Sequence, residues 1–444
     1  MQNNILSRDL INEHLLIEKG EGCYIFDKNG NQYLDAVGGA AVVNCGHSVP
    51  EIVQSIYEQL KKLCYVNSSF SNQPKIELAE QLSKLVPKKM GKVKTIFCSG
   101  GSEATESALK MARQFNVERN KLSKYKIISR WLSYHGNTLG ALSMSGRLSW
   151  RAKYIPLLLD FPHIPPPYCY RCWYNKQYPH CNLECAWELE RIINFEGQDS
   201  ISAFICEPII GTTATGVTPP NEYFEIIRQI CDKYNVLLIV DEVITGLGRT
   251  GKNFGINHWN ISPDMIVVGK GLSGGYTPLA GLIVSEEIWK VLANGSGGFD
   301  HSFTYSGNPL SCAAGKAVLD YMQEKKLIKR SEEMGNKLFE KLQSFNEIDI
   351  VGDIRGKGLL QGIEFVCNKQ TKKPFPSEKK ISEKIVKEAF KRGLLVISGL
   401  QGTLNGIEGD HIQITPPYII NEEQIDFLVK TLKESILEVE KSEI

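Results

Sequence analysis

The chain has 444 residues, of which 42% are hydrophobic and 23% are charged. This length is enough for two or three domains, and a core of that size needs no disulfide or metal to fold. The 51 Lys and Arg residues balance 50 Asp and Glu residues, which argues against a nucleic-acid partner recognised through a basic surface.

The ends and the apolar runs predict where the protein works. Residues 1–16 show no basic segment followed by an apolar one, so we expect no signal peptide. The longest apolar runs, such as Val236–Val240, have the length of a strand and are far too short to span a membrane. The 12 cysteines in a long chain of this kind predict a reduced, cytoplasmic protein rather than a disulfide framework.

From about residue 95 onwards, short apolar runs alternate with amphipathic stretches. Helical spacing puts Leu78, Leu82 and Leu85 on one face, and Pro219–Asn221 reads as a helix start. Several runs are apolar throughout, which is typical of strands buried on both faces of a parallel sheet. The pattern predicts an open α/β sheet. Its expected strands are Thr95–Cys98, Lys126–Ser129, Ser202–Cys206, Val236–Val240, Met265–Val268 and Gly281–Ser285.

The pattern changes after about residue 310. Expected strands at Gly358–Phe365, Leu394–Ile397 and Ile412–Thr415 precede a long helix that Asn421 caps. We predict a large α/β domain over residues 66–310 and a smaller α+β domain over residues 311–444. The N-terminal segment, residues 1–65, is expected to join the smaller domain.

Lys270 is the first candidate catalytic residue. It stands among glycines just past the apolar run Met265–Val268, and ligands of open α/β sheets bind beyond the carboxyl ends of the strands. A lysine amine that burial deprotonates can form a Schiff base. For one lysine taken alone, a solvated loop residue is the commoner interpretation, so its neighbours must decide.

Asp241 ends the run Val236–Val240, so it is expected at the same sheet edge as Lys270. A buried carboxylate needs a cationic or donor partner, and a protonated pyridine nitrogen would supply one. A helix cap or a metal ligand is an equally good interpretation of Asp241 taken alone.

Two further motifs follow strands. Gly100-Gly101-Ser102 lies between a strand and an amphipathic helix, where free backbone N–H groups bind phosphate, although such a turn is often only a cap. No Gly-Lys-Ser/Thr follows, which disfavours nucleotide hydrolysis. Tyr134 offers an aromatic ring that stacks on a flat cofactor or, as a lone aromatic more often does, packs in the core.

Together these residues resemble the class III aminotransferases, the subgroup II members of pyridoxal phosphate (PLP) fold type I. The likeness extends from about Gly20 to Pro416-Pro417. The matching pieces, in order, are Ser99–Ala104, Tyr134-His135-Gly136, Glu207-Pro208, Asp241–Gly251, Lys270 and Phe303–Leu310. The resemblance implies a large domain with a mostly parallel seven-stranded sheet flanked by helices, plus a smaller α+β domain built from both termini.

The resemblance also implies a role for each matching residue. Lys270 carries the cofactor as a Schiff base and acts as the general base, and Asp241 pairs with the pyridine nitrogen. Thr304 reaches the cofactor phosphate of a neighbouring subunit, so a homodimer is expected. His135 and Arg249 belong to the motifs, and His135 is grouped with the cofactor-binding residues, but a structural role is the expectation for both. The remaining assignments are the phosphate for Gly101 and Ser102, the two ring faces for Tyr134 and Val243, and the phenolic oxygen and substrate for Glu207.

One departure bears on the substrate. Family members that act on 2-oxoglutarate or α-amino acids commonly carry an Arg three residues before the Pro-Pro pair, and Gln413 stands there in this chain. Glutamine cannot make that charge pair. We therefore expect an amine or ω-amino acid donor with pyruvate as acceptor, and take Gln413 as a tentative substrate residue.

A cysteine-rich stretch has no place in this pattern. Cys169, Cys172, Cys181 and Cys185 have the spacing C-x2-C-x8-C-x3-C. Four thiolates at such a spacing can hold a structural zinc, although a metal-free surface loop is the preferred interpretation.

Two other functions stay open at this point. An amino-acid racemase or epimerase of the same fold would use the same lysine, aspartate and phosphate loop. A non-catalytic binding protein is the remote alternative, because such a protein would be expected to have lost Lys270 or Asp241.

Overall fold

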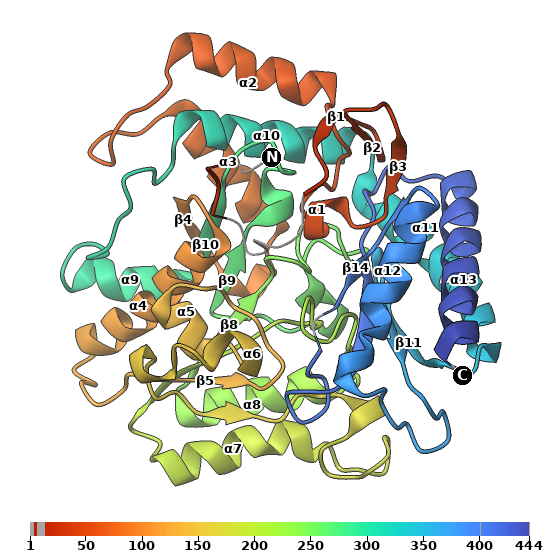
Figure 1. Cartoon of the computed structure of the whole chain (residues 1–444). Helices are drawn as coiled ribbons and strands as arrows, with labels where there is room; N and C mark the ends of the chain where they lie inside the picture. The colour runs from red at the N-terminus through yellow and green to blue at the C-terminus, as the bar shows by residue number, and fades with distance from the viewer. Residues whose placement is uncertain (1–3, 7–13, 400, 444) are drawn as a thin grey trace.

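The computed structural model describes residues 4–6, 14–399 and 401–443. The expected segment 1–65 therefore includes residues 1–3 and 7–13, which lie outside the described part. The ribbon view shows helices packed around a central sheet, with the C-terminal helices and strands gathered on one side (Figure 1). Among the described residues, no helix is long and apolar enough to cross a membrane.

Within the described residues, seven strands form the central sheet. β10 is antiparallel to both of its neighbours, and the other strands run parallel to one another. The mostly parallel seven-stranded sheet is thus confirmed, and each of the six strands expected here lies within one residue of its predicted ends. In spatial order the strands are β4 (Lys94–Cys98), β10 (Ala280–Val284), β9 (Met265–Val268), β8 (Leu237–Asp241), β7 (Ile201–Cys206), β5 (Lys126–Arg130) and β6 (His163–Ile164).

Helices cover both faces of this sheet because its strands are apolar on both sides. On one face, Ile205, Ile239 and Val267 pack with Ala108 and Met111 of α4 in one hydrophobic cluster. On the other face, alternate strand residues join a second cluster with α3 and α8. The flanking helices are α3 (Gln73–Leu85), α4 (Gly101–Glu118), α5 (Leu139–Met144), α7 (Glu184–Glu196), α8 (Tyr223–Tyr234), α9 (Glu286–Asn294) and α10 (Pro309–Glu324).

The two ends of the chain meet in the smaller sheets. One sheet contains β1 (Ile17–Glu21), β2 (Tyr24–Asp27), β3 (Gln32–Asp35) and β13 (Leu394–Leu395). A second contains β11 (Val351–Lys357), β12 (Leu360–Phe365), β15 (Asp410–Ile414) and β14 (Ile397–Ser398). The expected single strand at Leu394–Ile397 is therefore wrong. The chain crosses from one sheet to the other at the buried Val396, so β13 pairs with β3 and β14 with β15.

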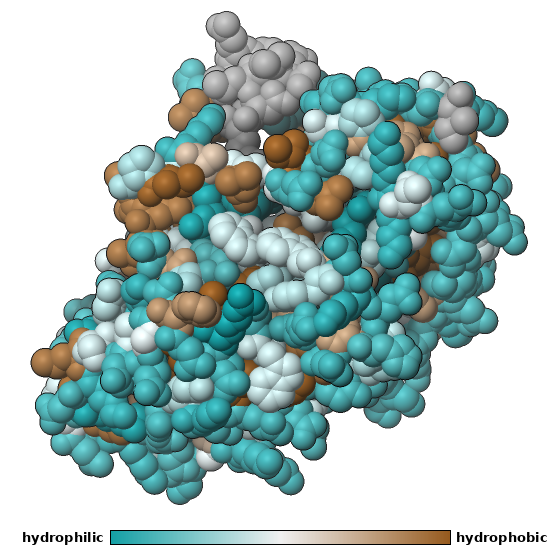
Figure 2. Space-filling view, turned by 90° about the horizontal axis from the view of Figure 1, so that it is seen from below, coloured by the Kyte–Doolittle hydropathy of each residue, from teal (hydrophilic) through white to brown (hydrophobic). Residues whose placement is uncertain are grey.

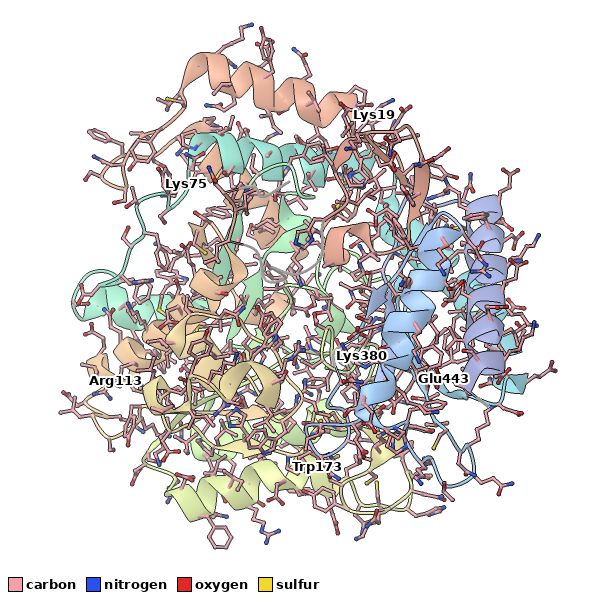
Figure 3. All side chains as sticks on the ribbon, in the orientation of Figure 1. Lys19, Lys75, Arg113, Trp173, Lys380 and Glu443 are labelled. Atoms are coloured by element: carbon pink, nitrogen blue, oxygen red, sulfur yellow. The ribbon has the colours of Figure 1, made fainter. Side chains whose placement is uncertain are left out.

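The remaining helices include α11 (Leu327–Leu342), α12 (Ile381–Lys391) and the long α13 (Glu422–Glu443). Asn421 caps α13 as expected, since its Oδ1 accepts the Gln424 N–H at 2.8 Å. The carboxylate of Glu443, at the other end of α13, pairs with Lys379 at 3.0 Å and with Lys384 of α12. Figure 3 labels Glu443 at this end of the helix. Three further helices are α1 (Gly38–Ala41), α6 (Leu148–Arg151) and α2 (Pro50–Lys62). Helix α2 packs on α10.

The surface is largely hydrophilic but also carries exposed apolar side chains. In the space-filling view most of one face is hydrophilic, and hydrophobic side chains gather towards one side of it (Figure 2). Exposed apolar side chains also cluster in the chain between α2 and α3, where Phe70 is 64% exposed and Tyr65 is 39% exposed. Apolar groups that gather in this way mark a surface that another chain can cover.

Candidate active site

The carboxyl ends of β4, β7, β8 and β9 lie at one edge of the central sheet, because these strands are parallel. Glu207 follows β7, Asp241 ends β8, and Lys270 lies two residues after β9. In the ladder, Asp241 is opposite Val267, which puts Lys270 just beyond Asp241 on the neighbouring strand. Gly101 begins α4 three residues after β4.

Lys270 stands on a constrained piece of backbone. Its φ is 43°, in the left-handed region that non-glycine residues rarely adopt, and Gly269 and Gly271 flank it. Burial lowers the pKa of its amine to about 8, against the opposing effect of the Asp241 and Glu207 carboxylates. An amine with this pKa is partly neutral near physiological pH, as a nucleophile or general base requires.

Asp241 is a buried carboxylate with two donors. Its Oδ2 lies 2.7 Å from His135 Nδ1, and its Oδ1 accepts the Val243 N–H at 3.0 Å. His135 is itself fixed, because its backbone N–H donates to Ser145 Oγ at 2.8 Å. The structural role expected for His135 is therefore specific: it orients the acid that lies next to Lys270. The Val243 N–H contact is of the kind that a capping Asp makes, and the His135 contact is additional to it.

Glu207 is held by Tyr134 and by Arg130, a residue that the sequence did not single out. Arg130, fully buried at the end of β5, donates to the Glu207 backbone carbonyl and lies 3.5 Å from its Oε2. The Tyr134 N–H donates to Glu207 Oε1 at 3.2 Å. Burial raises the pKa of the Glu207 carboxyl, while the charges of His135 and Arg130 oppose this. The sequence signal for Arg130 was its position directly after the expected strand Lys126–Ser129.

The start of α4 has no side-chain cap. Gly100 precedes the helix, and uncapped N–H groups of a first helical turn are suited to bind an anion. Ser102 Oγ accepts the Asn137 N–H at 3.1 Å, which joins this turn to the segment that carries Tyr134. A Cβ at Gly101 would lie 3.3 Å from both methyl groups of Val243, so a larger residue would intrude between them.

Tyr134 and Val243 lie on different walls of the site. The Tyr134 ring meets Trp150 edge to face, with ring centroids 4.7 Å apart. Val243 lies two residues after Asp241 and contacts the space beside Gly101 and Gly269. Tyr134 precedes His135 and Val243 follows Asp241 by two residues, so both adjoin the hydrogen-bonded Asp241–His135 pair.

Thr304 and Gln413 lie in different surroundings. Thr304 is exposed, and its carbonyl accepts the Tyr65 hydroxyl at 3.0 Å. Gln413 is buried in β15, where its Nε2 donates to Thr415 Oγ1 at 3.1 Å.

The structural role expected for Arg249 fits its contacts. Its guanidinium is buried and donates to the carbonyls of Leu359 and Pro416, at 3.0 and 2.6 Å. It also lies 4.6 Å from the centre of the Tyr418 ring. Arg249 therefore ties the loop after β8 to the C-terminal part of the chain.

The four cysteines of the C-x2-C-x8-C-x3-C stretch lie close together. Burial is the largest cause that raises the pKa of the Cys185 thiol, and the three neighbouring cysteines raise it further. All are free thiols. In the part of the chain that the structure describes, no three His, Cys, Asp or Glu side chains are placed to hold a metal ion. The zinc hypothesis gains no support from this geometry.

Comparison with known proteins decides the family. The model for aminotransferase class-III matches residues 5–436. The chain is a class III aminotransferase. It is 39% identical to the uncharacterized aminotransferase YodT of Bacillus subtilis, over 100% of this chain and 99% of that protein. It is 35% identical to gamma aminobutyrate transaminase 2 of Solanum lycopersicum, over 96% and 92% of the two chains.

A solved structure gives the same assignment. The (S)-enantioselective omega-transaminase from Thermomicrobium roseum superposes with a TM-score of 0.89 at 35% identity, covering 96% of this chain and 93% of that one. The class III aminotransferase therefore transfers amino groups and depends on PLP, as the resemblance implied. The site fits that cofactor, since a phosphate cradle, a buried acid and a lysine with a lowered pKa converge at one sheet edge.

Proposed function

We propose that this aminotransferase moves the amino group of an amine or ω-amino acid to pyruvate, with Lys270, Asp241 and Glu207 as its catalytic residues. The observation that carries the proposal is the convergence of the Lys270 amine, whose pKa is about 8, with the buried Asp241–His135 pair. When bound, PLP supplies an electron sink for the carbanion that forms as the substrate loses a proton. The protein supplies position and proton transfer.

Lys270 Nζ would hold the cofactor, and its amine would take up and return the proton of the substrate carbon. Its lowered pKa suits it to both tasks, because the neutral amine is the form that attacks and accepts a proton. Asp241 would pair with the pyridine nitrogen and keep it protonated. The His135 bond supports this role because it holds the carboxylate in one orientation.

Gly101 and Ser102 bind the phosphate through the free N–H groups at the start of α4. Tyr134 and Val243 would hold the two faces of the cofactor ring. Glu207, with its carboxyl oriented by Arg130 and the Tyr134 N–H, lies towards the phenolic oxygen and the substrate. Gln413 stays a tentative substrate residue, since its amide is engaged with Thr415.

We further propose that the enzyme is a homodimer in which Thr304 reaches the neighbour's cofactor phosphate. Thr304 is exposed, and its carbonyl accepts the hydroxyl of the exposed Tyr65. Tyr65 and Tyr305 pack edge to face beside it, with ring centroids 5.9 Å apart, and Tyr305 is 61% exposed. A surface of this kind is stabilised when a second subunit covers it.

The cytoplasm is the proposed location. All 12 cysteines are free, including the partly exposed thiols of the cysteine-rich stretch, and a reducing compartment keeps thiols in this state.

The visible absorption of the purified holoenzyme tests the reaction. An amine or ω-amino acid should bleach the cofactor band, and pyruvate should restore it. If the band persists while an amino acid loses its optical activity, the chain would be a racemase or epimerase instead. The Lys270→Ala variant should fold normally, as judged by circular dichroism, and lose turnover. Retained turnover would remove the central claim.

A further inference from the structure

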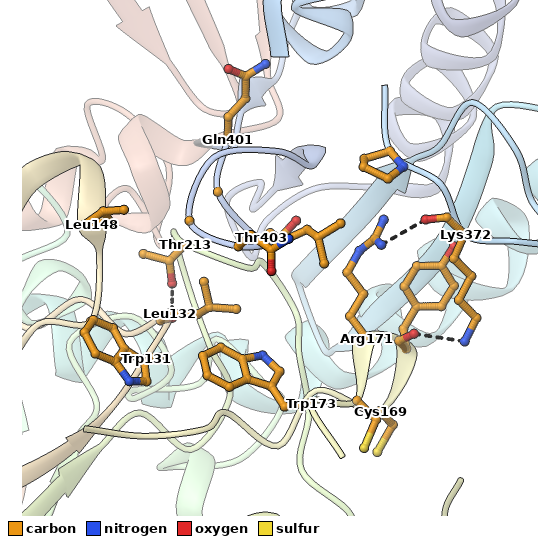
Figure 4. Close-up of a pocket in the computed structure, with 18 of the residues that line it drawn as sticks. Trp131, Leu132, Leu148, Cys169, Arg171, Trp173, Thr213, Lys372, Gln401 and Thr403 are labelled. Atoms are coloured by element: carbon orange, nitrogen blue, oxygen red, sulfur yellow. Dashed lines mark hydrogen bonds between the residues drawn. The ribbon is translucent and has the colours of Figure 1, made fainter. Parts of the chain in front are cut away.

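A large pocket lies next to the segment that carries Tyr134, because Leu132 is one of its lining residues. It has a volume of about 1190 Å³ and opens between the large sheet and the C-terminal part of the chain. Figure 4 shows Trp131, Leu132 and Leu148 on one side, with Arg171 and Thr403 opposite. Apolar and aromatic side chains thus form much of one wall.

The charged side chains that line this pocket all carry positive charge. Among the described residues that line it, five are cationic and none is Asp or Glu: Arg147, Arg171, Lys176, Lys372 and Lys373. Arg171 and Lys176 contact the carboxylates of Glu364 and Glu184, which lie outside the lining. The Arg171 side chain is only 7% exposed, and its Nη2 is a buried donor with no hydrogen-bond partner among the described residues. A wall of this kind attracts an anion.

Arg147 is the cation closest to the catalytic segment. Its guanidinium lies 4.1 Å from the centre of the Trp150 ring, and that ring meets Tyr134 edge to face. Arg147 follows Gly146, whose N–H donates to the Ser133 carbonyl, the residue before Tyr134. Leu132 lines the pocket and Tyr134 follows it by two residues, so the pocket lies next to the segment that leads into the Lys270 site.

Arg147 also approaches β15. Its charge contributes to the lowered pKa of His411, after burial and Arg355 as the larger causes. His411 and Gln413 are two residues apart on a strand, so their side chains point to the same face. Gln413 occupies the position where an arginine would meet a substrate carboxylate, and Arg147 brings a guanidinium to the same strand from another element.

We propose that this pocket binds the carboxylate end of the substrate and that Arg147 is the cation that pairs with it. The substrate class is then an ω-amino acid whose apolar chain lies along the aromatic wall while its amine reaches Lys270. The inference rests on the proposed use of amines and ω-amino acids as donors. Arg147 would then take the role of the arginine that is absent at position 413.

Calorimetric titration of the holoenzyme with butyrate and with butyramide tests the pocket without turnover. The two probes differ in charge and hardly in shape. The wild type should bind butyrate about ten- to a hundredfold more tightly, the range of a charge-assisted hydrogen bond. Arg147→Gln should remove this preference, whereas Lys373→Gln, an exposed lysine of the same lining, should keep it within about twofold.

Equal binding of the two probes by the wild type, or an undiminished preference in Arg147→Gln, overturns the proposal. If circular dichroism shows that Arg147→Gln is unfolded, Arg147→Lys decides. That variant keeps the charge but loses the two-pronged donor, so the preference should shrink and not vanish. An unchanged or absent preference in Arg147→Lys contradicts the pairing.

Half-reaction kinetics with 4-aminobutyrate and n-butylamine then connect the pocket to catalysis. In Arg147→Gln the KM for 4-aminobutyrate should rise about ten- to a hundredfold, while both constants for n-butylamine stay unchanged. Equal losses with both donors would place Arg147 outside substrate recognition. If the wild type accepts neither donor, the proposed donor class fails, and the calorimetric comparison still decides whether the pocket binds carboxylates.

Discussion

Replacing His135 by Leu removes the imidazole donor that lies 2.7 Å from Asp241 Oδ2. Asp241 then keeps the Val243 N–H, at 3.0 Å, as its remaining donor of the two described above. A hydrogen bond to a charged, buried group contributes about 1.5–3 kcal/mol. If Asp241 pairs with the cofactor as proposed, the Kd for PLP should rise about ten- to 150-fold, since each 1.4 kcal/mol corresponds to tenfold.

His135→Asn is the matched control, because the Asn amide can place a donor near the position of the imidazole Nδ1. We expect this variant to bind PLP within a few-fold of the wild type. The Kd is measured by titrating apoenzyme with PLP and following the absorption of the bound cofactor. Unchanged affinity in His135→Leu, or an equal loss in both variants, would refute the reasoning, since the hydrogen bond would then not be the cause.

Three further outcomes are expected. Because the pKa of Lys270 is about 8 and the neutral amine is the reactive form, the rate at which apoenzyme captures PLP should rise with pH to a plateau above about 8. A midpoint near the ordinary lysine value of 10.5 would contradict the burial. Glu364→Gln leaves the buried guanidiniums of Arg171 and Arg355 without the carboxylate they share, so urea unfolding should show a loss of about 3–5 kcal/mol. A loss below about 1 kcal/mol would mean that this carboxyl is neutral in the fold. Lys124→Met strips the donor from three carbonyls, those of Ile201, Tyr234 and Asn235, and should lower the free energy of unfolding by at least about 2 kcal/mol. Lys121→Met, on the neighbouring turn, serves as its control.

Local sequence patterns could not predict some of the contacts in the site. His135 and Asp241 are 106 positions apart, and Arg130 and Glu207 are 77 apart, so no periodicity joins them. The same holds for Arg147, which comes near β15 only through the packing of the C-terminal part of the chain. The sequence marked Gln413 as a missing arginine but had no means of locating a substitute.

The sequence by itself determined six of the seven strands of the central sheet, because strands buried on both faces are largely apolar, whereas the two-residue β6 (His163–Ile164) was not expected. It also determined that Gly101, Asp241 and Lys270 stand directly after such strands, and parallel strands bring their carboxyl ends to one edge. Only the tertiary structure decided which partner orients each acid and where Leu394–Ile397 divides between two sheets. It alone placed the cations of the pocket beside an aromatic wall. These features depend on side chains that distant segments bring into contact, and packing of the whole chain sets those distances.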